Sequence, residues 1–229
     1  MTGSVAFVGA GPGAVDLLTR AGRSALAAAD VIVSDRPSLD AVIDEHAPHA
    51  ERVLVGRAPG RPALDVPAIA AVLAEHHVRG DRVVRLKSGD LFVCSRAAEE
   101  IRALHELGIA VDLVPGVSAA LAAPLAADRA LVTGGRGSFT VVAGNDDPAY
   151  PAVDWDAVAG SPGPVVVLMG RGRQATIAEA LLAGGRPRDQ DVVVVHGATR
   201  GDVTVERTTL AELGPVSYTH LTLPTILRV

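Results

Sequence analysis

The chain has 229 residues, 48% of them hydrophobic, and a formal net charge of −5. This length allows one large or two small domains with an ample core, and the negative charge excludes the basic surface that nucleic acid or an anionic membrane requires. The single cysteine, Cys94, excludes an intramolecular disulfide framework and favours a reducing compartment. No signal peptide or bilayer-length apolar run is seen, so a cytoplasmic protein is expected.

The hydrophobic pattern predicts alternating strands and helices up to about residue 127. The predicted strands are 4–9, 30–35, 52–55, 83–84 and 111–114. The predicted helices are an Ala-rich one ending near 29, then 38–45, 66–79, one starting near 95, and 118–127. Such alternation is typical of a parallel sheet with crossover helices. A mainly parallel sheet of about five strands is therefore expected in a first lobe.

A linker at 128–136 precedes a second α/β set. Its predicted elements are strands at 138–143, 164–168 and 191–196, an antiparallel partner at 203–208, and a helix at 174–183. The fold class is thus α/β, with two lobes at 1–130 and 131–214. The cleft between two such lobes is the expected small-molecule site.

The turn after the first strand, Gly9-Ala10-Gly11-Pro12-Gly13-Ala14, lets a backbone approach a ligand closely. With Asp35 further on, it matches the dinucleotide pattern G-x-G-x-x-G/A, which predicts a flavin or nicotinamide oxidoreductase. The alternative is a tight strand-to-helix turn without a ligand. The pattern alone leaves both interpretations open.

The most informative stretch, residues 83–100, runs from a strand through Ser88-Gly89-Asp90 into a helix. Arg96 and Glu99 share one face of that helix, either as site residues or as a surface ion pair. The loop at 56–62 offers Arg57 and Arg61 to an anion, or is a solvated connector. Two further groups have structural alternatives. Ser118 is a helix cap or a ligand contact, and the adjacent His76 and His77 are expected to be solvated or to favour the helix dipole.

Six motifs in order, across residues 5–210, resemble those of the tetrapyrrole methylases. They are V-G-A-G-P-G, D-L-L-T, R-L-K-S-G-D-L-F-V-C-S-R-A-A-E-E, V-P-G-V-S-A-A, the strand ending in Met169-Gly170, and A-T-R-G-D. The long central motif is similar to that of members acting on uroporphyrinogen III. The resemblance implies S-adenosylmethionine-dependent C-methylation of this substrate to precorrin-2, for sirohaem and cobalamin biosynthesis. It further implies a cytosolic homodimer that needs no metal.

The resemblance also implies roles for individual residues. Arg96 and Glu99 match the catalytic pair, and Arg57, Arg129 and Arg136 are candidates to bind a substrate with eight carboxylates. The implied cofactor-binding residues are Gly11, Pro12, Gly13, Gly89, Asp90, Val93, Ser118, Ala119, Met169 and Ala198.

Several positions depart from the family pattern, namely Ala14, Ser88, Leu91, Ser95, Ala97, Ala98, Gly134-Gly135 and Asn145. An added Cβ costs about 1 kcal/mol where φ must be positive. The departures keep two alternatives open: another precorrin methyltransferase of the family, or a degenerate, inactive cofactor-binding domain.

The last residues, 215–229, differ in character from the rest. Val216-Ser217-Tyr218-Thr219-His220-Leu221 resembles the translation of a transposon-end adapter from sequencing libraries. We expect a non-native tail, a natural chain cut near Gly214, and a second lobe with an incomplete sheet or a loosely packed end. The alternative is a genuine closing strand, because apolar and polar residues alternate along much of the segment.

Overall fold

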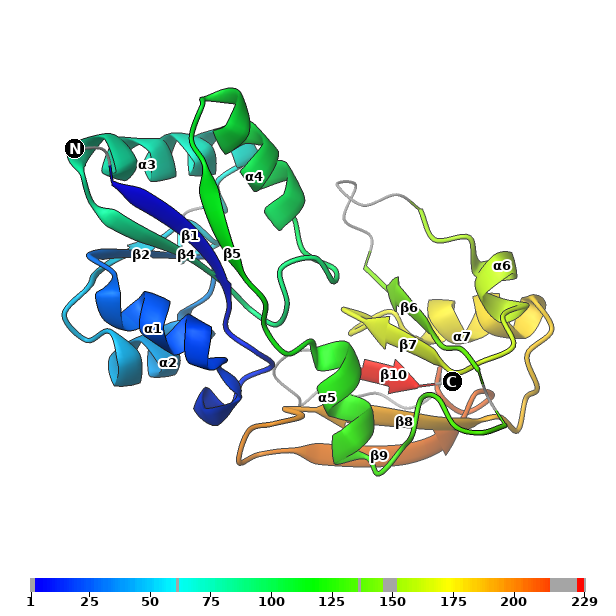
Figure 1. The fold of residues 1–229 in the computed structure, drawn as a ribbon. Coiled ribbons are helices and arrows are strands. Elements are labelled where there is room, and N and C mark those ends of the chain that lie inside the picture. Colours follow the sequence, from blue (N-terminus) through cyan, green and yellow to red (C-terminus); the bar gives the residue numbers. More distant parts are fainter. Residues whose placement is uncertain (1–2, 61, 136, 146–151, 215–225, 229) are drawn as a thin grey trace. The chain divides into compact units, whose positions relative to one another are not determined.

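The computed structural model of the chain describes residues 3–60, 62–135, 137–145, 152–214 and 226–228 (Figure 1). Contacts divide the chain into two α/β units, Met1–Ser118 and Ala119–Val229. The sequence placed this boundary near residue 130. The difference concerns helix α5 (Ala119–Ala126), which packs against strands β7, β8 and β10 of the second unit.

The first unit is built on a five-stranded sheet in the order β3-β2-β4-β1-β5. Every neighbouring pair is parallel, which confirms the predicted parallel sheet. The strands are β1 (Ser4–Gly9), β2 (Val31–Ser34), β3 (Glu51–Leu54), β4 (Arg82–Lys87) and β5 (Val111–Val114). All their carboxyl ends therefore lie at one edge of the sheet, where α/β proteins place ligand sites.

Two pairs of helices cover the two faces of this sheet (Figure 1). α1 (Arg20–Ala28) and α2 (Asp40–His46) pack on one face, and α3 (Val66–Arg79) and α4 (Ala97–Glu106) pack on the other. Short 3₁₀ turns, η1 (Val15–Leu17) and η2 (Pro37–Leu39), precede the first pair.

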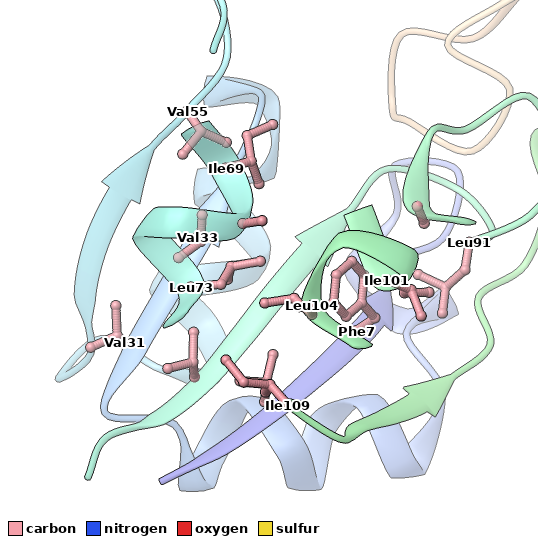
Figure 2. Close-up of a cluster of buried hydrophobic side chains, with 14 residues drawn as sticks. Phe7, Val31, Val33, Val55, Ile69, Leu73, Leu91, Ile101, Leu104 and Ile109 are labelled. Carbon is pink, nitrogen blue, oxygen red and sulfur yellow. The ribbon is translucent and has the colours of Figure 1, made fainter. Parts of the chain in front are cut away.

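Alternation along the strands divides the apolar side chains between two cores. Figure 2 shows the core under α3 and α4, where Phe7 and Val33 from the sheet meet Leu73 and Leu104 from the helices. Their neighbours in the sheet, such as Val8 and Ile32, face α1 and α2 instead. A sheet buried on both faces explains why its strands read as continuous apolar runs.

Side-chain caps define where two helices of this unit begin. The Thr19 hydroxyl accepts a hydrogen bond from Gly22 N at 3.1 Å, and Asp65 Oδ1 accepts from Ala68 N at 3.0 Å.

The expectation that His76 is solvated is wrong. It is buried at the end of α3, and its Nδ1 lies 2.8 Å from Asp81 Oδ2, because the next turn brings that carboxylate under the helix.

The second unit holds a mixed sheet in the order β6-β7-β10-β8-β9. Its strands are β6 (Thr140–Ala143), β7 (Val165–Leu168), β8 (Asp191–His196), β9 (Thr204–Thr209) and β10 (Ile226–Arg228). The predicted antiparallel pairing of β8 with β9 is confirmed. Beside α5, the unit has α7 (Gln174–Ala183) and a short helix, α6 (Trp155–Ala159), that the sequence did not predict.

The terminal segment contributes one strand to this sheet. β10 pairs antiparallel with both β7 and β8, placing Leu227 opposite Val167 and Val194. Tyr218 and Leu221, whose burial would test the adapter interpretation, lie outside the described residues. The origin of the tail stays a prediction.

Among the described residues, no helix combines the length and the apolar character that crossing a membrane requires.

Candidate functional site

Three turns meet at the carboxyl edge of the first sheet. Gly89 N donates to Gly11 O at 2.8 Å, and Gly11 N donates to Gly89 O at 3.2 Å, which ties the turn after β1 to the turn after β4. The turn after β5 packs against both, since a Cβ on Gly9 would lie 2.5 Å from Gly116 N and 2.7 Å from Gly89 O. Glycine is therefore required where these backbones touch.

The two paired glycines also shape the turns. Gly11 has φ of 81° and Gly89 has φ of 72°, the left-handed region that other residues rarely adopt. A Cβ built on Gly89 would meet no atom within 4 Å. The Gly89 backbone thus borders open space and leaves room for a ligand to approach, which fits the role that the family resemblance implies.

Asp90 follows at once and shapes its own loop. Its Oδ1 accepts a hydrogen bond from Phe92 N at 2.9 Å, as in an Asx turn. The side chain is only partly buried. The carboxylate is therefore held in place by its own loop at the edge where the glycine turns meet.

Arg96 caps the start of α4, and Glu99 lies in the first turn. The two side chains form no ion pair with each other, so the surface-pair interpretation finds no support. Within the described chain, Arg96 Nε is buried and has no hydrogen-bond partner. A partly buried guanidinium with an unsatisfied donor is suited to an anionic ligand.

A buried charge cluster lies directly beneath this edge, and the sequence did not predict it. Glu100 Oε2 accepts from Arg85 Nε at 2.8 Å, and Glu100 Oε1 accepts from Arg85 Nη2 at 3.1 Å and from Lys87 Nζ at 2.8 Å. Asp35 Oδ2 lies 3.8 Å from Lys87 Nζ and 4.0 Å from Arg85 Nη2. Two cations and two carboxylates thus balance one another.

The surroundings of the cluster shift the pKa values of Glu100 and Lys87. Burial alone raises the pKa of Glu100, but hydrogen bonds and charge from Arg85, with the charge of Lys87, lower it overall. Burial lowers the pKa of Lys87, and the neighbouring Arg85 lowers it further against the opposing effect of Glu100. One signal in the sequence marked Glu100: it shares the helical face of Ala97, Ile101 and Leu104, which are all buried.

The positions that depart from the family pattern carry no backbone strain. Cys94, Asp128 and Met169 are the non-glycine residues with positive φ in the described chain. None of the departures is among them, so the expected cost of a misplaced Cβ does not arise. Leu91 and Ala97 are fully packed in the core under α3 and α4.

The three candidate substrate arginines are placed very differently. Arg57 is exposed in the loop after β3. Arg129 forms an ion pair with Asp191 within the second unit, and its Nε is buried without a hydrogen-bond partner in the described chain. Arg136 lies outside the described residues, as does Arg61.

Two candidate cofactor residues lie at the carboxyl ends of strands in the second unit. Met169 follows β7 with φ of 59°, a conformation that costs energy for a non-glycine residue. Asn145, at the end of β6, donates from Nδ2 to Met169 Sδ at 3.6 Å. Ala198 follows β8 and Gly197.

In the part of the chain that the structure describes, no group of His, Cys, Asp and Glu is placed to hold a metal ion.

The chain is similar to one known protein family along most of its length. The family model of the Tetrapyrrole (Corrin/Porphyrin) Methylases matches residues 4–214. Siroheme synthase 1 of Serratia proteamaculans is 35% identical over 212 residues, which are 92% of this chain and 44% of that protein. The chain therefore spans less than half the length of that relative.

Two other relatives match over most of their length. The S-adenosyl-L-methionine-dependent uroporphyrinogen III methyltransferase of Methanosarcina barkeri is 34% identical over 218 residues, 94% of this chain and 86% of that protein. The uroporphyrin-III C-methyl transferase from Thermus thermophilus, crystallised with S-adenyl homocysteine, superposes with a TM-score of 0.82 at 31% identity, covering 99% of this chain and 92% of the other. The chain belongs to the tetrapyrrole methylases.

Proposed function

We propose that the chain is an S-adenosylmethionine-dependent C-methyltransferase that converts uroporphyrinogen III to precorrin-2. The meeting of the turns at Gly9–Gly13, Gly89–Asp90 and Gly116 at one sheet edge carries the proposal, because it places the two most characteristic motifs side by side. The names of the relatives support the substrate and the donor. A cytoplasmic homodimer is part of the same proposal.

The residues of this edge suit the reaction without a metal. S-adenosylmethionine supplies an electrophilic methyl group on a sulfonium, which needs only an aligned carbon nucleophile. Gly11, Pro12, Gly13 and Gly89 would let the backbone approach the donor, and Asp90 would accept hydrogen bonds from it. The family resemblance alone supports Val93, Ser118, Ala119, Met169 and Ala198 as further proposed contacts of the donor. Positioning of the reactants then supplies most of the rate enhancement.

The substrate side of the proposal depends on Arg96 and Glu99. Arg96 would pair with an acetate or propionate of the tetrapyrrole, because its guanidinium has an unsatisfied buried donor. Glu99, one turn along, would accept an N–H of a pyrrole. Arg57, Arg129 and Arg136 remain proposed further contacts for the carboxylates.

The competing oxidoreductase interpretation required Asp35 to bind a ribose. In the structure Asp35 Oδ2 lies 3.8 Å from Lys87 Nζ and 4.0 Å from Arg85 Nη2, and its Oδ1 is buried, so the carboxylate is directed toward the buried cations. Calorimetry with S-adenosylhomocysteine, NAD and FAD separates the two functions. Binding of a dinucleotide in place of S-adenosylhomocysteine would reject the methyltransferase.

The decisive assay is methyl transfer to uroporphyrinogen III under anaerobic, reducing conditions, followed by mass spectrometry of the product. We expect one or two added methyl groups. Methylation of a later precorrin, but not of uroporphyrinogen III, would favour a sibling enzyme of the same family. Cofactor binding without any transfer would favour a degenerate domain.

The donor site predicts a loss of binding when Asp90 is changed. Asp90→Ala should abolish measurable binding of S-adenosylhomocysteine, because it removes both the carboxylate and the hydrogen bond that shapes the loop. Asp90→Asn keeps an acceptor for Phe92 N and should weaken binding about ten- to hundredfold. Titration calorimetry measures both variants. Parental affinity in Asp90→Ala would remove this residue from the site.

The substrate site predicts a different pattern for Arg96. Arg96→Ala should leave S-adenosylhomocysteine affinity unchanged and lower kcat/KM for the tetrapyrrole by about 10² or more, because a charged donor to the substrate is lost. Arg102→Ala, an exposed arginine on the same helix, is the matched control. Equal activity of the two variants would show that Arg96 has no special role.

A further inference from the structure

The buried cluster of Arg85, Lys87, Glu100 and Asp35, here called the charge cluster, has no role in the function proposed above. Relative exposures of the side chains are 1% for Arg85, 7% for Lys87 and 2% for Glu100. Buried ion pairs are poor sources of stability, since apolar residues of the same volume often stabilise as well or better. Stability alone therefore does not explain why charged and not apolar residues stand at these positions.

Lys87 is the member that links the cluster to the site. It is the last residue of β4, and its carbonyl accepts from Ala10 N at 2.7 Å, beside the paired turns at Gly11 and Gly89. Its ammonium group donates to Glu100, one residue after Glu99 and four after Arg96. One side chain thus connects the glycine turns to the first turn of α4.

Glu100 does not depend on Lys87 for a partner. Arg85 donates to both of its carboxylate oxygens. Asp35 lies 3.8 Å from Lys87 Nζ, beyond hydrogen-bond distance, and its side chain is 28% exposed. Losing the charge of Lys87 would leave the Glu100–Arg85 pair intact and would give the cluster a net negative charge under the substrate edge.

A net negative charge there matters because the proposed substrate carries eight carboxylates. In a buried setting such a charge is weakly screened and acts over several ångströms. The chain contains a single lysine and otherwise uses arginine for its cations, and that lysine stands at this position. Lys87 also carries the one side-chain amine of the sequence, and unlike an arginine it can lose its charge as the pH rises.

We propose that Lys87 is a positioning residue for the tetrapyrrole: it holds the first turn of α4 beneath Arg96 and cancels the buried negative charge that would otherwise repel a polycarboxylate. This inference rests on the proposed function but concerns substrate binding, not methyl transfer. Arg85, Glu100 and Asp35 are the charged groups that face Lys87, from β4, α4 and the end of β2.

The test uses binding of uroporphyrin III, the oxidised octacarboxylate, in the full chain. Lys87→Met should weaken this binding about tenfold and leave S-adenosylhomocysteine affinity unchanged. Lys87→Arg keeps the charge and should retain most of the affinity. Equal uroporphyrin III affinity in the parent and in Lys87→Met would overturn the proposal, as would a parent that does not bind uroporphyrin III.

A pH series provides a readout that a merely structural lysine would not change. Because this is the only lysine, protein labelled with lysine enriched in ¹³C at Cε gives one NMR signal, which titrates with Lys87 itself. We expect uroporphyrin III affinity of the parent to fall with the same alkaline midpoint as that signal, and the fall to move to higher pH in Lys87→Arg. An alkaline fall that is unchanged in Lys87→Arg would overturn the proposal, even if Lys87→Met does not fold.

The two proposals fail in different ways. A parent that binds uroporphyrin III but never methylates uroporphyrinogen III would refute the proposed function, and the Lys87 inference would still be decided by the binding series. A parent that methylates, with Lys87→Met binding uroporphyrin III as tightly as it does, would refute only the inference.

Discussion

Replacing Glu100 by glutamine should lower the free energy of unfolding by about 3–5 kcal/mol, one of the largest effects expected of a point change in this chain. The variant leaves Arg85 and Lys87 buried without the carboxylate that both contact. Urea denaturation followed by circular dichroism measures the change. Domains of this size are stable by about 5–15 kcal/mol, so a large part of that stability is at stake.

The matched control is Glu106→Gln, an exposed glutamate on the same helix, which should change the unfolding free energy by less than about 0.5 kcal/mol. Combining Glu100→Gln with Lys87→Met removes one of the stranded cations and should recover part of the loss. If Glu100→Gln is no less stable than the control, the charge cluster does not hold α4.

The effect of Glu100 should depend on pH. Its pKa is lowered in the folded state, so its stabilising contribution is complete above the unfolded pKa of about 4.5 and is lost as the pH falls through the lower, folded value. The difference between parent and variant should therefore be largest near neutral pH and shrink in acid. Lys87 acts oppositely: its lowered pKa costs stability at neutral pH, and this cost is relieved as the pH rises toward 10.5.

The second large effect is expected at Gly116. Gly116→Ala should abolish binding of S-adenosylhomocysteine and destabilise the first unit by about 1–3 kcal/mol. A Cβ there would collide with the Gly89 carbonyl and lie 2.7 Å from the Gly9 carbonyl carbon, and backbone atoms cannot yield as a flexible side chain can. The turns would have to separate, and the donor site is built where they meet.

Gly160→Ala serves as the control, because a Cβ there would meet nothing closer than 3.5 Å and its φ is −72°. It should bind S-adenosylhomocysteine with parental affinity. Calorimetry and urea denaturation of both variants decide the matter. Parental binding by Gly116→Ala would mean that the contact of the three turns is not needed for the site.

Much of the first unit followed from periodicity and turn chemistry. The apolar runs predicted all five strands, and the pattern of residues 66–79 predicted α3 to its observed ends. Failures occurred where a residue's environment depends on a distant segment. His76 is buried because Asp81 turns back beneath it, and Glu100 is buried because β4 offers two cations from the sheet.

Other differences have the same origin. The sequence assigned α5 to the first lobe, since a helix normally continues the preceding βα unit, but its packing partners are strands far along the chain. Short α6 had too few turns to show a helical period. The three-residue strand β10 lies within a segment whose pattern pointed to no particular partner.

The order of motifs along the chain was enough to determine the family, and the alternation of apolar strands and helices was enough to predict the parallel sheet of the first unit, because both depend on local spacing and on residue types. Tertiary structure alone decided that Gly9, Gly89 and Gly116 touch, that Arg96 keeps an unsatisfied donor, and that Glu100, not Glu99, pairs with Arg85 and Lys87. Those outcomes depend on which distant backbones pack together, and no single stretch of sequence contains that information.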